Sequence, residues 1–300
     1  MIEVMGENST AKSAFGYHAI GAFQRAGGKC ILIDSEAKAD SAFMERMGLD
    51  FKKLSYSQGE NMEGCIQVLK RVGELADPAV PILIVWDSIA STPGAAELDK
   101  YVADKEFKGD VGARARQLSA SLRATLGPLA RKNVTFIAIN QLRTKFNFMG
   151  MASQDATGGK APKYHAGVRL MFKTKGMIRH KERDVITGIA VEVEAKKNAC
   201  SPPFRKCQVK FYFDTGFAPY SGLDELLLRH GRISQKAGWL VYKEKTFRGG
   251  ELERVIAEMP DLIDPLVGVV DTPTGDDISS GNGQADTKAN AEEAAETAEE

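Results

Sequence analysis

The sequence predicts an α/β fold in which a mostly parallel, twisted sheet is flanked by helices. Three uninterrupted apolar runs have the composition of strands that are covered on both faces. They lie at residues 30–34, 82–87 and 134–141. Segments with helical periodicity alternate with these strands, near residues 15–26, 41–47, 61–75 and 111–132. Strands that alternate with helices in this way indicate a doubly wound sheet.

The stretch GENSTAKSAF, which begins at Gly6, follows the phosphate-binding pattern G-x-x-x-x-G-K-[ST] except that Ala11 replaces the second glycine. A strand at residues 2–5 precedes it and a helix follows it, as the motif requires. Lys12 can reach the β- and γ-phosphates, and Ser13 can offer its hydroxyl to Mg²⁺. Because alanine strains such a loop without forbidding it, we expect nucleotide binding here. The alternative is a chance Gly–Lys loop.

Polar side chains end three of the other predicted strands, at the edge where a parallel sheet binds its ligand. Asp87 ends an apolar strand and is a candidate for orienting Mg²⁺ through water. Glu36 follows another strand and is a candidate for polarising the attacking water. Gln141 ends a third and can sense a γ-phosphate. The alternatives are a turn-capping aspartate, an incidental acid and a buried amide that the backbone satisfies.

Residues 142–163 lack a clear period, which predicts a long loop, and residues 142–169 combine basic with aromatic side chains. The basic members are Arg143, Lys145, Lys160, Lys163 and Arg169, and the aromatic members are Phe146, Phe148 and Tyr164. A second basic cluster opens the helix near 111–132 and consists of Arg114, Arg116 and Arg123. Basic groups follow a phosphate backbone while aromatic rings stack on bases, so the two clusters predict a polyanion-binding groove. The alternative is a pair of solvated charged faces.

Charge is unevenly distributed along a chain whose formal net charge is zero. Residues 271–300 contain nine acidic residues and one lysine, so they carry −8 and the rest of the chain carries +8. We expect an ATPase core at residues 1–217, a small C-terminal α/β domain at 218–270 and a disordered acidic tail at 271–300. The tail is a solubilising end or an intramolecular mimic of a polyanion.

The remaining composition favours a cytoplasmic protein. No run reaches the eighteen apolar residues of a membrane span, and no basic, apolar leader opens the sequence. Four cysteines lack C-x-x-C spacing, which favours reduced structural thiols over zinc ligands or disulfides.

With these motifs assembled, residues 1–270 resemble a RecA-family recombinase. Gly6 to Ser13 resembles the phosphate loop of the family, Ile33-Asp34-Ser35-Glu36 its catalytic-glutamate strand, and Val85-Trp86-Asp87-Ser88 its magnesium-associated strand. Asn140-Gln141 resembles its allosteric glutamine, Lys108-Gly109-Asp110 its first DNA-binding loop and Thr157-Gly158-Gly159-Lys160 its second. Pro219-Tyr220-Ser221-Gly222 and Lys236-Ala237-Gly238-Trp239 resemble parts of its C-terminal domain.

The resemblance implies ATP and Mg²⁺ as cofactors, with Glu36, Lys12 and Gln141 as catalytic residues. It implies metal association at Ser13 and, through water, at Asp87. The implied ATP-binding residues are Gly6, Glu7, Asn8, Ser9, Thr10, Ala11, Lys12, Ser13, Ala14, Asp40, Phe43, Asp87 and Gln141. The implied DNA-binding residues are Arg114, Arg116, Arg123, Gly158, Gly159, Lys160, Lys163, Tyr164 and Arg169.

Several details are similar to the phage branch of the family, in which the residue before the loop lysine is not always glycine. Lys197 matches one of two lysines that reach the nucleotide across a subunit interface, whereas Ala199 stands at the position of the other. The helix and strand that precede the core in the family are not found before residue 2. We therefore expect a homo-oligomeric filament on DNA that is weakened at this contact.

The function implied is ATP-dependent binding of single-stranded DNA, with pairing to a homologous duplex and strand exchange, in recombination and repair. The first alternative is a ring-forming, helicase-type ATPase on a similar core. The second is a DNA-binding module with an impaired ATPase, which the alanines at positions 11 and 199 suggest.

Overall fold

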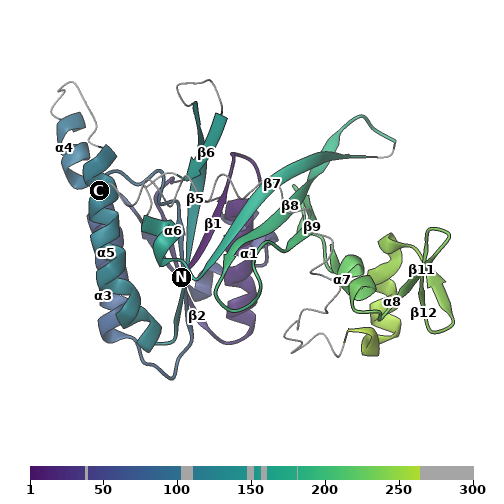
Figure 1. The fold of residues 1–300 in the computed structure, drawn as a ribbon. Coiled ribbons are helices and arrows are strands. Elements are labelled where there is room, and N and C mark those ends of the chain that lie inside the picture. Colours follow the sequence, from purple (N-terminus) through teal and green to yellow (C-terminus); the bar gives the residue numbers. More distant parts are fainter. Residues whose placement is uncertain (38–39, 103–110, 147–151, 157–160, 181, 264–300) are drawn as a thin grey trace. The chain divides into compact units, whose positions relative to one another are not determined.

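A ten-stranded mixed sheet organises the fold in this computed structural model, which describes residues 1–37, 40–102, 111–146, 152–156, 161–180 and 182–263 (Figure 1). The strand order is β10-β9-β8-β7-β1-β5-β4-β2-β3, and β6 pairs with β5 off this path. The parallel strands are β1 (Ile2–Gly6), β2 (Lys29–Asp34), β3 (Leu54–Gln58), β4 (Ile82–Asp87), β5 (Val134–Phe146) and β7 (Val168–Arg179). The antiparallel ones are β6 (Ala152–Ala156), β8 (Ile186–Asn198), β9 (Lys206–Tyr212) and β10 (Gly216–Phe217). The predicted α/β fold with a mostly parallel sheet is confirmed.

Helices cover both faces of the parallel part of this sheet. They are α1 (Lys12–Arg25), α2 (Ser41–Arg46), α3 (Met62–Leu75), α4 (Ala95–Val102), α5 (Val111–Arg131) and α6 (Ala161–His165), with a 3₁₀ turn at Phe51–Lys53. Three of them begin or end where the sequence places a polar cap. Asn61, for example, accepts a hydrogen bond of 2.8 Å from the backbone N–H of Gly64 at the start of α3.

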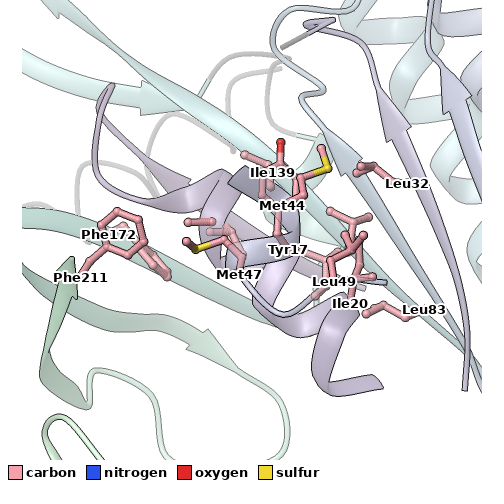
Figure 2. Packing of buried hydrophobic residues seen from close by; sticks show 14 of the residues in the cluster. Tyr17, Ile20, Leu32, Met44, Met47, Leu49, Leu83, Ile139, Phe172 and Phe211 are labelled. Atoms are coloured by element: carbon pink, nitrogen blue, oxygen red, sulfur yellow. The ribbon is translucent and has the colours of Figure 1, made fainter. Parts of the chain in front are cut away.

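The alternation along β4 shows how the two faces are filled. Leu83 and Val85 point into a cluster formed with α1 and α2, in which Tyr17 and Ile20 of α1 lie among apolar side chains from the sheet and from α2 (Figure 2). Ile84 and Trp86 point to the other face and pack in a cluster with α3 and α5. Because successive side chains of a strand point to opposite faces, an uninterrupted apolar run is what a doubly covered strand requires.

The segment after Gln141 is more ordered than its lack of period predicts. Strand β5 continues to Phe146, and β6 returns antiparallel to it in a register that pairs Leu142 with Ala156 and Phe146 with Ala152. Helix α6 follows before β7. The expected structureless loop at 142–163 is therefore wrong in part. Backbone hydrogen bonds pair these two strands, and such pairing does not require a periodic pattern of side chains.

The C-terminal part contains α7 (Leu223–Arg229), a small sheet and α8 (Leu252–Glu258). The small sheet has the order β11 (Ser234–Lys236), β12 (Trp239–Tyr242) and β13 (Lys245–Phe247), and 3₁₀ turns lie at Gly249–Glu251 and Pro260–Leu262. The described residues from Met1 to Met259 form one compact unit, and a second unit begins at Pro260. The boundary expected at residue 218 stays a prediction, and the acidic tail expected at 271–300 lies outside the described residues.

Within the described ranges, none of the helices combines the length and the apolar character needed to cross a lipid bilayer.

Candidate nucleotide site and its link to a basic segment

The loop between β1 and α1 contains two non-glycine residues in the left-handed region, Ser9 at φ 58° and Ala11 at φ 63°. Ala11 therefore has the backbone conformation that favours the glycine of the phosphate-binding pattern. Its methyl group packs against the apolar cluster under α1. Position 6 requires glycine for a different reason, which is space. A Cβ atom there would lie 2.5 Å from the carbonyl oxygen of Phe172. The loop thus keeps glycine where space demands it and accepts alanine where only strain opposes it.

Lys12 is buried at the start of α1, with 7% of its surface exposed. Its ammonium donates hydrogen bonds to the carbonyl oxygen of Glu7 and, over 3.4 Å, to the hydroxyl of Thr10. Burial lowers the pKa of Lys12, and the nearby carboxylates of Asp87 and Glu36 oppose this shift. The first N–H groups of a helix have no partner within that helix. Together with the ammonium of Lys12, the N–H groups at the start of α1 therefore suit this position to bind an anion.

Asp87 ends β4 beside this lysine and is 6% exposed. Its carboxylate accepts hydrogen bonds from the hydroxyl of Ser13 and, over 3.4 Å, from that of Tyr17. Burial raises the pKa of Asp87 to about 6, the hydrogen bond from Ser13 opposes the rise, and the charges of Glu36 and Asp34 add to it. A bound divalent cation would relieve this unfavourable charge.

Glu36 follows the end of β2 and lies at the same edge of the sheet as Asp87, where the parallel strands end. Its Oε1 accepts 2.7 Å and 2.9 Å hydrogen bonds from the side chains of Gln141 and Ser88. The strand register explains why these side chains meet. Gly6 of β1 pairs with Gln141 of β5, and Asp34 of β2 pairs with Asp87 of β4, so the four strands end at the same level. The structure therefore gathers Lys12, Ser13, Asp87, Glu36 and Gln141 at the carboxyl ends of four parallel strands.

This set of groups fits a magnesium–nucleotide complex. It offers a buried ammonium, the N–H groups at the start of α1, and a hydroxyl bound to a carboxylate whose charge is poorly compensated. A glutamate and an amide lie beside them. Lys12, Ser13 and Asp87 are the residues that would hold the phosphates and the metal.

Asp40 and Phe43, two of the implied ATP-binding residues that the resemblance places near the adenine, lie at helix α2. The carboxylate of Asp40 accepts hydrogen bonds of 2.9 Å and 3.4 Å from the N–H groups of Ala42 and Phe43, and so caps the helix. The ring of Phe43 lies edge-on to Tyr17, with the centroids 6.3 Å apart, and the guanidinium of Arg46 lies over it. Contacts of Asp40 and Phe43 with a base stay predictions.

The predicted DNA-binding residues after Gln141 fall into two groups. Gly158, Gly159 and Lys160 lie outside the described residues. Lys163 and Tyr164 are exposed on α6, Tyr164 with 66% of its surface. Lys197, expected at a subunit interface, donates hydrogen bonds of 3.3 Å and 3.2 Å to the carbonyl oxygens of these two residues. A cation at the carbonyl end of a short helix stabilises it, so Lys197 holds α6 in place.

Two of the predicted DNA-binding arginines have partners within the fold. The guanidinium of Arg169 donates a 2.6 Å hydrogen bond to Oε2 of Glu3 and is 13% exposed. Arg114 donates to the carbonyl oxygen of Ala90 over 3.1 Å and lies 4.0 Å from the carboxylate of Glu97. These contacts do not favour either arginine as a phosphate ligand. Arg116 and Arg123 are exposed on α5, as a DNA contact requires.

Sequence reasoning assigned no role to Tyr17, Ser88 or Glu3, which contact the predicted site or the strands that carry it. Ser88 directly follows Asp87, and Tyr17 lies one helical turn after Ser13, so i+4 spacing was an available signal. Glu3 is a charged residue in an otherwise apolar strand, β1, which lies between β5 and β7 in the sheet. An acid in such a strand is itself a signal, because it must be paired.

Comparison with known proteins agrees with this geometry. A family model of the RecA N-terminal domain matches residues 1–218. Protein RecA of Paracoccus denitrificans is 29% identical over 264 residues, which cover 87% of this chain and 72% of that protein. Protein RecA of Gluconacetobacter polyoxogenes is 32% identical over 239 residues, 80% of this chain and 66% of that protein. Protein RecA of Bacteroides thetaiotaomicron is 30% identical over 272 residues, covering 90% and 80%. The chain therefore belongs to the RecA family.

Proposed function

We propose that this protein is a DNA-dependent ATPase that binds single-stranded DNA and promotes homologous pairing and strand exchange in recombination and repair. One observation carries the proposal most directly. The hydrogen bond from Gln141 to Glu36 joins the nucleotide site to the strand that runs into residues 142–169, which we call the basic segment. A DNA-dependent ATPase needs such a link, and a site that only stored nucleotide would not.

In the proposed mechanism, bound MgATP supplies the phosphoryl group and a metal charge that stabilises the transition state. Lys12 would neutralise negative charge on the phosphates, and the metal would be held by Ser13 through its hydroxyl and by Asp87 through water. Glu36 orients the attacking water. Exchange of one hydrogen bond at Glu36 for another changes the position of Gln141, and with it the start of the basic segment.

The proposed partners are single-stranded DNA, double-stranded DNA and further copies of this chain in a filament on DNA. Lys163 and Tyr164 support the first, since an exposed cation and an exposed aromatic ring lie side by side on α6. We assign the chain to the phage branch of the family because Ala11 replaces glycine and the β2 end reads Asp34-Ser35-Glu36. Both features resemble the phage branch, in which the residue before the loop lysine is not always glycine and the glutamate strand can read Asp-Ser-Glu.

Phosphate release with and without single-stranded DNA tests the proposal, together with a strand-exchange assay. We expect release to increase when DNA is added and strand exchange to require ATP. Release that is equally fast without DNA, from a ring of fixed size, would favour a helicase-type ATPase. DNA binding without any release would favour a module whose nucleotide site is impaired.

A further inference from the structure

A fully buried carboxylate lies in the middle of β1, outside the candidate nucleotide site. Glu3 is 0% exposed. Its Oε1 accepts a 2.9 Å hydrogen bond from the side-chain amide of Asn140 on β5, and its Oε2 accepts one of 2.6 Å from the guanidinium of Arg169 on β7. Since β1 lies between β5 and β7, this one side chain connects three neighbouring strands.

Stability alone does not explain a carboxylate at this place. Removing an ion pair from water costs several kcal/mol per ion, and apolar residues of similar volume are often as stabilising. The neighbours of Glu3 along β1, Ile2 and Val4, are apolar, and Val4 is fully buried. What the ion pair adds is a fixed geometry, because a buried charge is tolerated only with its partners in place.

The partners of Glu3 mark the two ends of the basic segment. Asn140 accepts a hydrogen bond of 3.0 Å from the backbone N–H of Gln141 at Oδ1, so its orientation bears directly on the residue that contacts Glu36. Arg169 is the second residue of β7, just after α6. Between them, the N–H of Gly167 donates to the carbonyl oxygen of Met1 over 3.0 Å. Residues 142–167 therefore connect β5 to β7, the two strands that flank β1, and Glu3 binds a side chain on each of these strands.

We propose that Glu3 is a positioning residue that couples the nucleotide site to the basic segment, acting through Asn140 on Gln141 and through Arg169 on the start of β7. This inference rests on the proposed function, because the coupling it describes is between nucleotide and DNA. The carboxylate transmits position only and touches no substrate.

Glu3→Gln is the first test. The two side chains have the same shape, but the amide of Gln has only one oxygen and places an N–H group against one of the two donors. Stimulation of phosphate release by single-stranded DNA should fall by about tenfold, within the usual range of coupling between sites. The KM for ATP without DNA should stay near the wild-type value, because Lys12, Ser13 and Asp87 are untouched.

Glu194→Gln is the matched control. Glu194 is also a buried carboxylate in the same sheet, 5% exposed, and it is paired with Lys196 over 2.9 Å and with Lys206 over 3.9 Å. It contacts neither end of the basic segment. Both variants should melt at lower temperature than the wild type, but only Glu3→Gln should lose stimulation. Equal stimulation in both variants would make Glu3 a structural residue and overturn the proposal.

Asn140→Leu is the second variant, which keeps the ion pair and removes its connection to Gln141. Its effect and that of Glu3→Gln should not add, since both interrupt one path. Full addition of the two effects in the double variant would contradict a shared path.

A readout without DNA separates this inference from the proposed function. The rate of trypsin cleavage after Arg143 and Lys145 should change when a non-hydrolysable ATP analogue is added to the wild type. The same addition should not change this rate in Glu3→Gln. If the wild type is not stimulated by DNA yet shows this dependence, the proposed function fails while the inference stands. If cleavage in the wild type ignores the nucleotide, or the variant keeps the dependence, the inference fails.

Discussion

The side-chain amide of Gln141 donates a 2.7 Å hydrogen bond to Oε1 of Glu36, a residue 105 positions away in the sequence. Gln141 lies in β5 and Glu36 follows the end of β2, and β4 separates these two strands in the sheet. A change at Glu36 that breaks this hydrogen bond therefore acts on Gln141, the residue of β5 that directly precedes the basic segment. This contact gives the proposed coupling a physical form.

Lys12→Ala should abolish hydrolysis, because it removes the main positive charge that this chain places on the transferring phosphoryl group. The fold should survive, since the variant removes a buried cation and leaves the helix with a better helix former. Phosphate release and a thermal melt without nucleotide check the two statements. Hydrolysis at the wild-type rate in Lys12→Ala would show that Lys12 does not act on the phosphates.

Ala11→Gly should stabilise the protein by up to about 1 kcal/mol, because a non-glycine residue at φ 63° is strained. Loss of the packed methyl group offsets part of this gain. The affinity for ATP, measured by calorimetry, should change little, since the loop conformation already exists with alanine. Loss of ATP binding in the glycine variant would show that the site requires the methyl group.

Asp87 makes the stability of the nucleotide-free protein depend on pH. Because its pKa rises from 3.8 to about 6 on folding, the folded state keeps a proton between these values that the unfolded state has lost. The contribution of Asp87 to stability therefore falls as pH rises through this window. Asp87→Asn should be more stable than the wild type by about 3 kcal/mol at pH 8, and this difference should fall below about 1 kcal/mol near pH 4.

Denaturant titrations in EDTA at several pH values test this prediction, since a chelator excludes stabilisation by bound metal. A stability difference between Asp87→Asn and the wild type that is constant from pH 4 to pH 8 would contradict the raised pKa.

Lys163→Ala and Tyr164→Ala should weaken single-stranded DNA binding in different ways. Loss of one lysine–phosphate contact should reduce the slope of log affinity against log salt by about 0.7. Loss of a stacking ring should cost about 1–3 kcal/mol with little change in slope. Binding measured across a salt series distinguishes them. If both variants keep the wild-type affinity and the wild-type salt dependence, α6 is an ordinary solvated surface and not a DNA contact.

The parts of this structure that the sequence predicted are those with local signals. The strand predicted at 82–87 is β4, and the helix predicted at 111–132 is α5, Val111–Arg131, because apolar runs and helical periodicity depend on neighbouring residues. The meeting of Glu36, Asp87 and Gln141 followed from one further rule, that parallel strands end at a common edge.

The parts that were missed depend on contacts between distant residues. Arg169 looked like one of several basic residues beside a loop, and its partner Glu3 is 166 positions away. The hairpin of β5 and β6 is held by backbone pairing, which leaves no pattern in the side chains. Ala11 shows a third limit, since a sequence pattern reports the usual residue at a strained position and not the residues that the position tolerates.

The affinity for single-stranded DNA with ADP and with a non-hydrolysable ATP analogue tests the central claim most directly. We expect the wild type to bind at least about fivefold more tightly with the analogue, the lower end of common coupling energies. Gln141→Ala should bind equally with both nucleotides. Ser88→Ala is the control, because it removes the other hydrogen bond to Oε1 of Glu36 without altering β5, and it should keep the difference. Equal affinities in the wild type, or an unchanged difference in Gln141→Ala, would contradict the account.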